Sequence, residues 1–315
     1  MLEKRSTSLF SVAVLAILLF SYAAFAQDEP AFPPVPVKMT VTAEAHHGKQ
    51  VPDVQASDVV VMQGKQRYRV TSWQPVNSAQ VGAQLFVLID DSLSTTDIGT
   101  KLGEVRSFIE SQPAFVQTGV AYMRNGTAIV AQNLTSDHAQ AAKALRLPIG
   151  EPNASASPYF SLQDLLKHWP NGSASRQVLM ITNGIDPYWD SNSLDDPYVN
   201  SAIDQAQRAG VVVSAIYASG AGHFGHTFWR TTLAQSLLSE VADATGGESY
   251  YLGNESPVTF TPYFKELTER LQHQYVLGFD AQPGRKPGLQ RVKVSTDTPG
   301  IELVGQTSVY VASGI

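Results

Sequence analysis

The sequence predicts an α/β fold: a doubly wound, mostly parallel sheet with one antiparallel hairpin edge, flanked on both sides by β segments. Two observations predict it. Continuous apolar runs at 85–89, 177–182 and 211–218 have the composition of parallel strands that are buried on both faces. Segments with helical spacing separate these runs, and this alternation is typical of a parallel sheet with helices on both faces.

The first segment is typical of a secretory signal peptide, which we place at 1–26. Lys4 and Arg5 precede a short apolar core, and Ala24-Phe25-Ala26 supplies the small-x-small end of a cleavage site. A retained membrane anchor is the alternative interpretation. Cleavage after Ala26 predicts an exported protein, either periplasmic or secreted.

Short antiparallel strands are expected in an N-terminal β region, 27–80. Residues 37–45 and 58–73 alternate apolar and polar side chains, with a turn at Gly64. The C-terminal region, 273–315, returns to this pattern. Its expected strands are 274–279, 290–296 and 301–311. The two flanks could pair into one β-sandwich with the α/β domain inserted between them, which the sequence does not decide.

The α/β domain is expected over 81–272. Apolar residues at helical spacing from Ile98 to Ile109 predict a helix after the first buried run, with cap candidates at Ser94–Thr96. Asn125-Gly126 between two alternating runs predicts a hairpin. Thr261, before a proline, is expected to cap the last helix. The other expected elements are helices 138–146, 162–169, 199–210, 233–247 and 262–272, and a strand at 249–252.

Composition excludes several classes of function. The 315 residues carry a net charge of −6, and the 22 basic residues are dispersed, which argues against nucleic acid or an anionic membrane as partner. Without cysteine there are no disulfides, thiol catalysis or zinc–thiolate sites. The sequence has no G-x-S-x-G, H-E-x-x-H or P-loop motif, and nothing local places a base beside Ser92. We therefore expect a protein that is not an enzyme.

Polar residues follow two of the buried runs directly. Asp90, Ser92 and Ser94 stand on alternate positions after the first run, and Thr182-Asn183-Gly184 follows the second. Ligands of open α/β sheets bind beyond the carboxyl ends of the strands. A carboxylate with two hydroxyls is a hard-oxygen donor set suited to Mg²⁺. Helix capping and a simple Asn-Gly turn are the alternative interpretations.

This pattern resembles the metal-ion-dependent adhesion site of von Willebrand factor A domains. In that family a D-x-S-x-S motif follows the first strand, and Asp90, Ser92 and Ser94 match it in full. The segment EVADATGGESYYL, a helix, QYVLGF and paired strands extend the resemblance to a group of bacterial secreted proteins related to this domain. The resemblance covers almost the whole mature chain and implies the doubly wound fold expected above.

The other two family motifs are altered. The family has a threonine in a second loop, for which Ser157 is the best match here, with Ser155 close behind it. The family's T-D-G motif is T-N-G in this chain, so that Asn183 replaces an acid. Losing a charge beside a divalent ion commonly weakens binding about 10–100-fold. Asp186 stands three residues further along and could compensate.

The resemblance implies an exported, non-enzymatic, adhesion-type module with a partly degenerate metal site. The ion would be Mg²⁺, or else Mn²⁺ or Ca²⁺, held weakly or absent, and an acidic side chain of a protein partner would complete its coordination. A metal-independent structural protein of the cell envelope is the alternative, and Asn183 favours it. A hydrolase that uses Ser92 is a third hypothesis.

Overall fold

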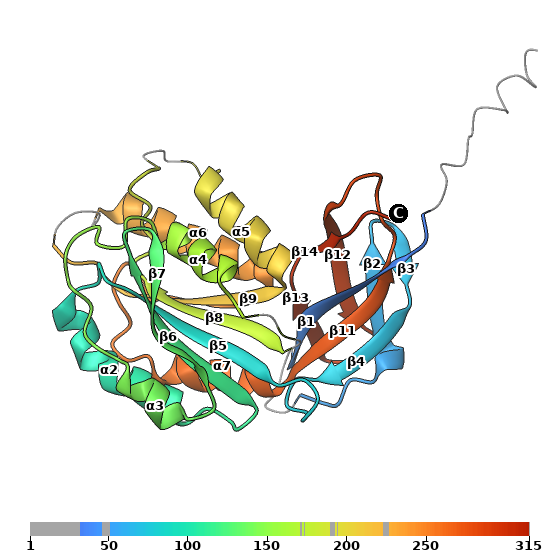
Figure 1. The fold of residues 1–315 in the computed structure, drawn as a ribbon, viewed down its shortest axis with the longest axis horizontal. Coiled ribbons are helices and arrows are strands. Elements are labelled where there is room, and N and C mark those ends of the chain that lie inside the picture. The colour runs from blue at the N-terminus through green and yellow to red at the C-terminus, as the bar shows by residue number, and fades with distance from the viewer. Residues whose placement is uncertain are drawn as a thin grey trace, which may run out of the picture.

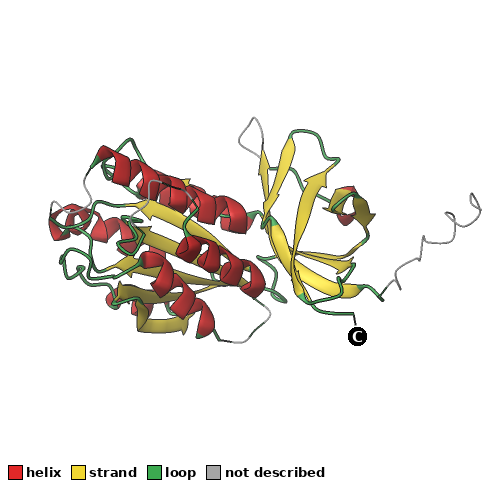
Figure 2. Ribbon diagram, turned by 90° about the horizontal axis from the view of Figure 1, so that it is seen from above, coloured by secondary structure: helices red, strands yellow, loops and turns green. Residues whose placement is uncertain are grey.

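The computed structural model describes residues 32–45, 51–170, 172, 174–189, 193, 195–222 and 227–314, so the expected signal peptide lies outside it. The chain forms a six-stranded sheet covered by helices and, beside it, two four-stranded sheets (Figures 1 and 2). The predicted fold class is confirmed. No helix in the described part of the chain has the length and apolar character that spanning a bilayer requires.

The six-stranded sheet has the order β10-β9-β8-β5-β6-β7. Neighbouring strands run parallel except for β7, which returns antiparallel to β6. Asn125 and Gly126 form that turn with φ of 50° and 73°, the left-handed conformation that this hairpin type needs. The strands are β5 Ala83–Asp90, β6 Val116–Arg124, β7 Thr127–Thr135, β8 Ser175–Thr182, β9 Val211–Tyr217 and β10 Ser249–Tyr250.

Helices cover both faces of this sheet (Figure 1). Alternate side chains of β5 enter opposite cores: Val87 packs with α2, α3 and α7, and Leu88 packs with α4, α5 and α6. A strand buried on both faces must be apolar at every position, which explains the continuous run. The helices are α2 Thr95–Glu110, α3 His138–Lys143, α4 Pro158–Lys167, α5 Pro197–Ala209, α6 Phe228–Thr245 and α7 Thr261–Gln272.

Helices α4, α5 and α6 begin earlier than expected, at Pro158, Pro197 and Phe228. Two further differences have a clear structural cause. Helix α3 ends at Lys143 because the backbone N–H of Arg146 donates to Tyr122 Oη (2.6 Å) instead of continuing the helix. Thr261 does not cap α7, since the cap position is Phe260. Glu104 of α2 caps α7 from outside, accepting from the N–H groups of Phe260 (2.8 Å) and Thr261 (2.7 Å).

The flanks of the chain pair with each other in two sheets that share one core. Strand β1 lies between β11 and β13, and β12 lies between β14 and β2, so each sheet takes strands from both ends of the chain. Val41, Val61 and Phe279 are fully buried between the sheets. The strands are β1 Val35–Ala45, β2 Val59–Gln63, β3 Gln66–Tyr68, β4 Val70–Pro75, β11 Gln274–Ala281, β12 Gly288–Thr296, β13 Ile301–Gly305 and β14 Ser308–Val311.

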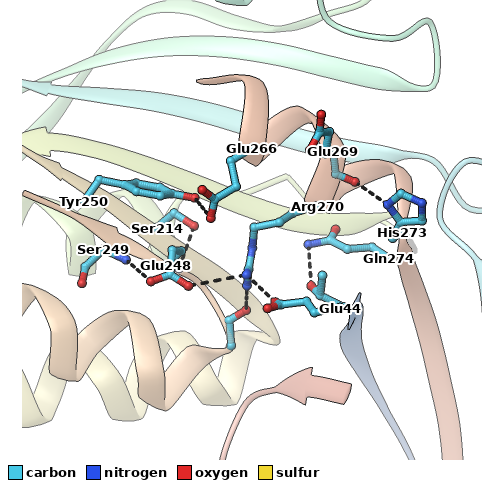
Figure 3. Close-up of polar contacts among 12 residues, drawn as sticks. Glu44, Ser214, Glu248, Ser249, Tyr250, Glu266, Glu269, Arg270, His273 and Gln274 are labelled. Atoms are coloured by element: carbon cyan, nitrogen blue, oxygen red, sulfur yellow. Dashed lines mark hydrogen bonds and ion pairs between the residues drawn. The ribbon is translucent and has the colours of Figure 1, made fainter. Parts of the chain in front are cut away.

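Buried polar contacts join the sandwich to the α/β part. Gln177 of β8 donates to Gln274 of β11 (2.9 Å). Arg270 of α7, 9% exposed, forms ion pairs with Glu44 of β1 and with Glu248 (3.5 Å), as Figure 3 shows. Burial raises the pKa of both glutamates although the Arg270 guanidinium lowers it. One cation therefore offsets two partly buried carboxylates at this junction.

Replacing Arg270 with Met should lower the free energy of unfolding by about 3 kcal/mol at pH 7.5, because Glu44 and Glu248 would stay charged without their cation. Burial already raises the pKa values of both glutamates, and they would rise further without the cation. A carboxyl with a raised folded-state pKa binds its proton more tightly in the folded state. The difference in unfolding free energy between the wild type and the variant should therefore shrink as pH falls to 5.

Urea unfolding at the two pH values measures this effect. Lys265→Met is the control, since it removes an exposed cation from the same helix. A deficit of equal size at pH 7.5 and pH 5 would contradict the role assigned to the two glutamates.

Candidate functional site

Four buried polar residues meet where β5 and β8 end. The strands are parallel neighbours, so their last residues, Asp90 and Thr182, come to the same edge of the sheet. Ser92 and Asn183 follow them in the two loops. All four are at most 8% exposed. We call these residues the Asp90 cluster. The two motifs that the sequence places after separate strands therefore lie side by side in the structure.

The Asp90 cluster is a closed hydrogen-bond network. Asp90 Oδ1 accepts from the backbone N–H (2.7 Å) and the hydroxyl (2.6 Å) of Ser92. Asp90 Oδ2 accepts from the Thr182 hydroxyl (2.7 Å). Asn183 donates from Nδ2 to Ser92 Oγ (3.0 Å) and accepts the N–H of Ile185 at Oδ1 (2.8 Å). A fully satisfied polar network of this kind fixes the loops that contribute to it.

Burial raises the pKa of Asp90, and hydrogen bonds from Ser92, Thr182 and Ser155 lower it in part. The carboxylate is fully buried, so its charge depends on these neutral donors. The nearest sequence neighbour, Asp91, has a different partner. It forms a two-point ion pair with Arg146 (2.6 and 2.8 Å), whose guanidinium lies over the ring of Tyr122. Sequence reasoning missed this pair because its members are far apart in the chain.

The loop before α4 sends its two serines to different acids. Ser157 donates to Asp186 Oδ2 (2.7 Å), whereas the Ser155 side chain faces Asp90. Ala156 between them has φ of 61°, and this left-handed residue reverses the side to which the neighbouring side chains point. Of the two serines considered for the family's threonine, Ser155 is therefore the one at Asp90. Asp186, a candidate replacement for the missing acid at Asn183, accepts instead from the Ser157 hydroxyl and from the N–H of Tyr188 (2.8 Å).

Ser94 stands apart from the Asp90 cluster. It is the N-cap of α2, and its hydroxyl accepts from the N–H of Asp97 (3.4 Å). The capping interpretation therefore applies to Ser94 but not to Asp90 or Ser92. The Asn-Gly turn interpretation holds in part, since Asn183 makes its own turn bond to Ile185 and also contacts Ser92.

A third loop, after β9, closes over the cluster. Ser94 N–H donates to the carbonyl of Ser219 (2.9 Å), and Ala221 N–H donates to that of Ser92 (2.8 Å). A Cβ at Gly220 would lie 2.8 Å from Asn183 Nδ2, so any larger residue here would have to displace the Asn183 amide. The sequence offered no signal for Gly220, because its role depends on a side chain from another loop.

The donor set fits a divalent ion poorly. Asp90 is its one carboxylate, and the described residues include no group of three or more His, Cys, Asp or Glu placed to hold a metal. Asn183 aims its amide N–H at Ser92 Oγ, and its own oxygen is engaged by Ile185. Mg²⁺ needs oxygen lone pairs in that position. An ion would have to displace this amide and would meet a single negative charge.

Comparison with known proteins finds no matching family model and no matching curated protein. Solved structures similar to this chain include VWA domain proteins. The conserved hypothetical protein BatB from Bacteroides thetaiotaomicron has 11% identity and a TM-score of 0.43, covering 60% of this chain and 97% of that one. An aerotolerance-related membrane protein from Bacteroides fragilis has 12% identity and a TM-score of 0.42, covering 60% and 98%.

The ArnB paralog VWA2 from Sulfolobus acidocaldarius covers 88% of this chain and 76% of its own, with 8% identity and a TM-score of 0.38. At such identities and TM-scores the similarity carries no argument about function. The function of this chain has to be argued from its own side chains.

Replacing Thr182 with Val should lower the free energy of unfolding by about 2 kcal/mol, because buried Asp90 Oδ2 and the Gly184 N–H would both lose their bond to the hydroxyl. Thr118→Val is a matched control. Thr118 is equally buried on β6 of the same sheet, but its hydroxyl has no partner among the described residues. That substitution should leave stability unchanged or increase it. Equal losses of unfolding free energy for the two variants, measured by urea unfolding, would contradict the hydrogen bonds assigned to Thr182.

Proposed function

We propose that this chain is an exported, non-enzymatic protein-binding module. Its binding face would be the surface formed by the loops 91–94, 150–157, 183–189 and 218–222, which we call the loop edge. The observation that carries the proposal is the Asp90 cluster, which ties these loops together without presenting a reactive group. The signal-peptide pattern at 1–26 supports export to the periplasm or the medium.

A loop edge fixed in advance suits recognition. Backbone bonds reinforce the side-chain network: the N–H of Gly150 donates to the Asp91 carbonyl (3.0 Å), and the third loop bonds to Ser92 and Ser94. A surface that is already ordered loses little conformational entropy when a partner binds. The position of the loop edge, beyond the carboxyl ends of the strands, is where ligands of open α/β sheets bind.

The environment of Ser92 supports a function without catalysis. Its hydroxyl donates to the Asp90 carboxylate and accepts from the Asn183 amide, and no described histidine is bonded to it as a base. The three described histidines are held elsewhere. Ring nitrogens of His138, His168 and His273 contact the backbone carbonyls of Val116, Asp164 and Glu269. A hydrolase that uses Ser92 has no support in this arrangement.

A divalent ion, if bound, would be held weakly by Asp90 with Ser92 and Ser155. It would supply a positive charge that favours an acidic side chain of the partner. The Asn183 amide favours the second candidate, a metal-independent module of the cell envelope, because it places a donor where the ion needs an acceptor. We expect Mg²⁺ and Mn²⁺ to bind more weakly than about 1 mM.

Calorimetry with Mg²⁺ and Mn²⁺ tests the assignment of Asn183. Asn183→Asp should tighten binding about 10–100-fold, since it adds a charge and removes the competing donor. Asn133→Asp, which adds the same charge at an exposed position on β7, should have no effect. Tight binding by the natural chain that Asp90→Ala abolishes would favour the metal-dependent form of the module.

Capture from an envelope extract of the producing cells tests the binding face. Thr96→Arg, at the start of α2 beside the loop edge, should reduce recovery of the partner at least about tenfold by steric and charge conflict. Ser111→Arg, at the opposite end of α2, should leave recovery unchanged. The reverse pattern would place the binding face at the other end of the sheet.

A further inference from the structure

A small pocket opens on the loop edge, between the β8–α5 connection and the first turns of α6. Two carboxylates and two indoles line it: Asp186 and Asp196, and Trp189 and Trp229, with Leu233 and Ala234 behind them. The cavity has a volume of about 40 Å³. This volume is large enough to hold a water molecule, but it is far smaller than the volume of pockets that bind whole metabolites. It fits the end of a single side chain.

Asp196 has an unused acceptor. The residue is fully buried at the N-cap of α5, where Oδ1 accepts the N–H groups of Tyr198 (2.8 Å) and Val199 (3.3 Å). Its other oxygen, Oδ2, has no hydrogen-bond partner in the part of the chain that the structure describes. A buried carboxylate oxygen without a donor is costly, so a ligand that donates a hydrogen bond to Asp196 Oδ2 would be stabilised here.

The chain around the pocket is strongly acidic. The described residues between 177 and 207 include no Lys, Arg or His, whereas they include Asp186, Asp195, Asp196 and Asp204. Arg230 of α6 also lines the pocket, which leaves two lining carboxylates against one lining cation. The surplus negative charge favours a cationic occupant over the acidic side chain that an adhesion-type metal site would attract.

The indoles narrow the choice of cation. Trp229 lines the pocket and is 75% exposed, and Trp189 lines it from the β8–α5 connection. A guanidinium is planar, stacks on aromatic faces and donates in a fork to carboxylates, whereas an ammonium is a strongly hydrated point charge. Indole faces beside two carboxylates are therefore suited to arginine.

We propose that this pocket binds the guanidinium of an arginine side chain presented by the protein partner. The guanidinium donates to Asp196 Oδ2 and to Asp186, and it stacks on Trp229. The inference rests on the proposed protein-binding function and gives it a partner chemistry: a basic segment in which arginine is the anchor.

Calorimetry of the full mature chain with a tetra-arginine peptide at 150 mM salt tests the proposal, with tetra-lysine and tetra-glutamate for comparison. Tetra-arginine should bind, tetra-lysine should bind at least about fivefold more weakly, and tetra-glutamate should give no heat. Absence of tetra-arginine binding, or equal affinity for tetra-lysine, would overturn the arginine assignment.

Asp196→Asn should weaken tetra-arginine binding about tenfold or more, because a charged hydrogen bond is lost. Asn caps helices as well as Asp does, so α5 should stay intact, which the thermal unfolding midpoint checks. Asp204→Asn removes the same charge from an exposed position on the same helix and should change affinity less than about twofold. Trp229→Ala should weaken binding about fivefold. Equal weakening by both Asn variants would show attraction to the acidic segment as a whole and overturn the pocket.

The two proposals fail separately. A partner that the wild type captures, that Thr96→Arg loses and that Asp196→Asn retains would keep the loop edge as the binding face and overturn the arginine pocket. Tetra-arginine binding that depends on Asp196, together with partner capture indifferent to Thr96→Arg, would keep the pocket and overturn the wider binding face.

Discussion

The burial of one carboxylate, Asp90, at the end of the central strand is the constraint on which the loop edge depends. A fully buried carboxylate must find donors or lose its charge. Ser92 and Thr182 supply them directly, and Asn183 is tied in through Ser92. Because these donors come from two loops, and a third packs against Asn183 through Gly220, the acid organises a surface that no single loop could form.

Charge is distributed over this edge in an uneven way. Arg146 is committed to Asp91, so it neutralises the acid beside the Asp90 cluster rather than the cluster itself. On the other side, Asp186 and Asp196 share a pocket with one cation. Asn183 brings an uncharged amide donor to Ser92, so the cluster has a single carboxylate and fits a divalent ion poorly. The same loop also contributes Asp186 to the acidic pocket.

The sandwich matters for the site because it anchors the other end of the sheet. Strand β11 follows α7 directly and carries the chain from the α/β part into the sandwich, where it lies between β1 and β4. Arg270, at the end of α7, contacts Glu44 of β1, so the last helix, the first strand and the sheet are fixed by one buried cation. Relative movement of the two parts would separate this cation from its glutamates.

The sequence by itself determined the fold class, the order of the elements and the residues of the Asp90 cluster, because each of these depends on local pattern. Continuous apolar runs predict strands that are buried on both faces. Acids and hydroxyls placed directly after such runs indicate where a strand ends. Only the tertiary structure decided which partner each side chain has. Ser155 rather than Ser157 faces Asp90 because of one left-handed residue, and Ser94 caps a helix. Asp196 and Trp229 line one pocket because the connection before α5 meets the first turn of α6, and no local sequence pattern encodes a contact between segments so far apart in the chain.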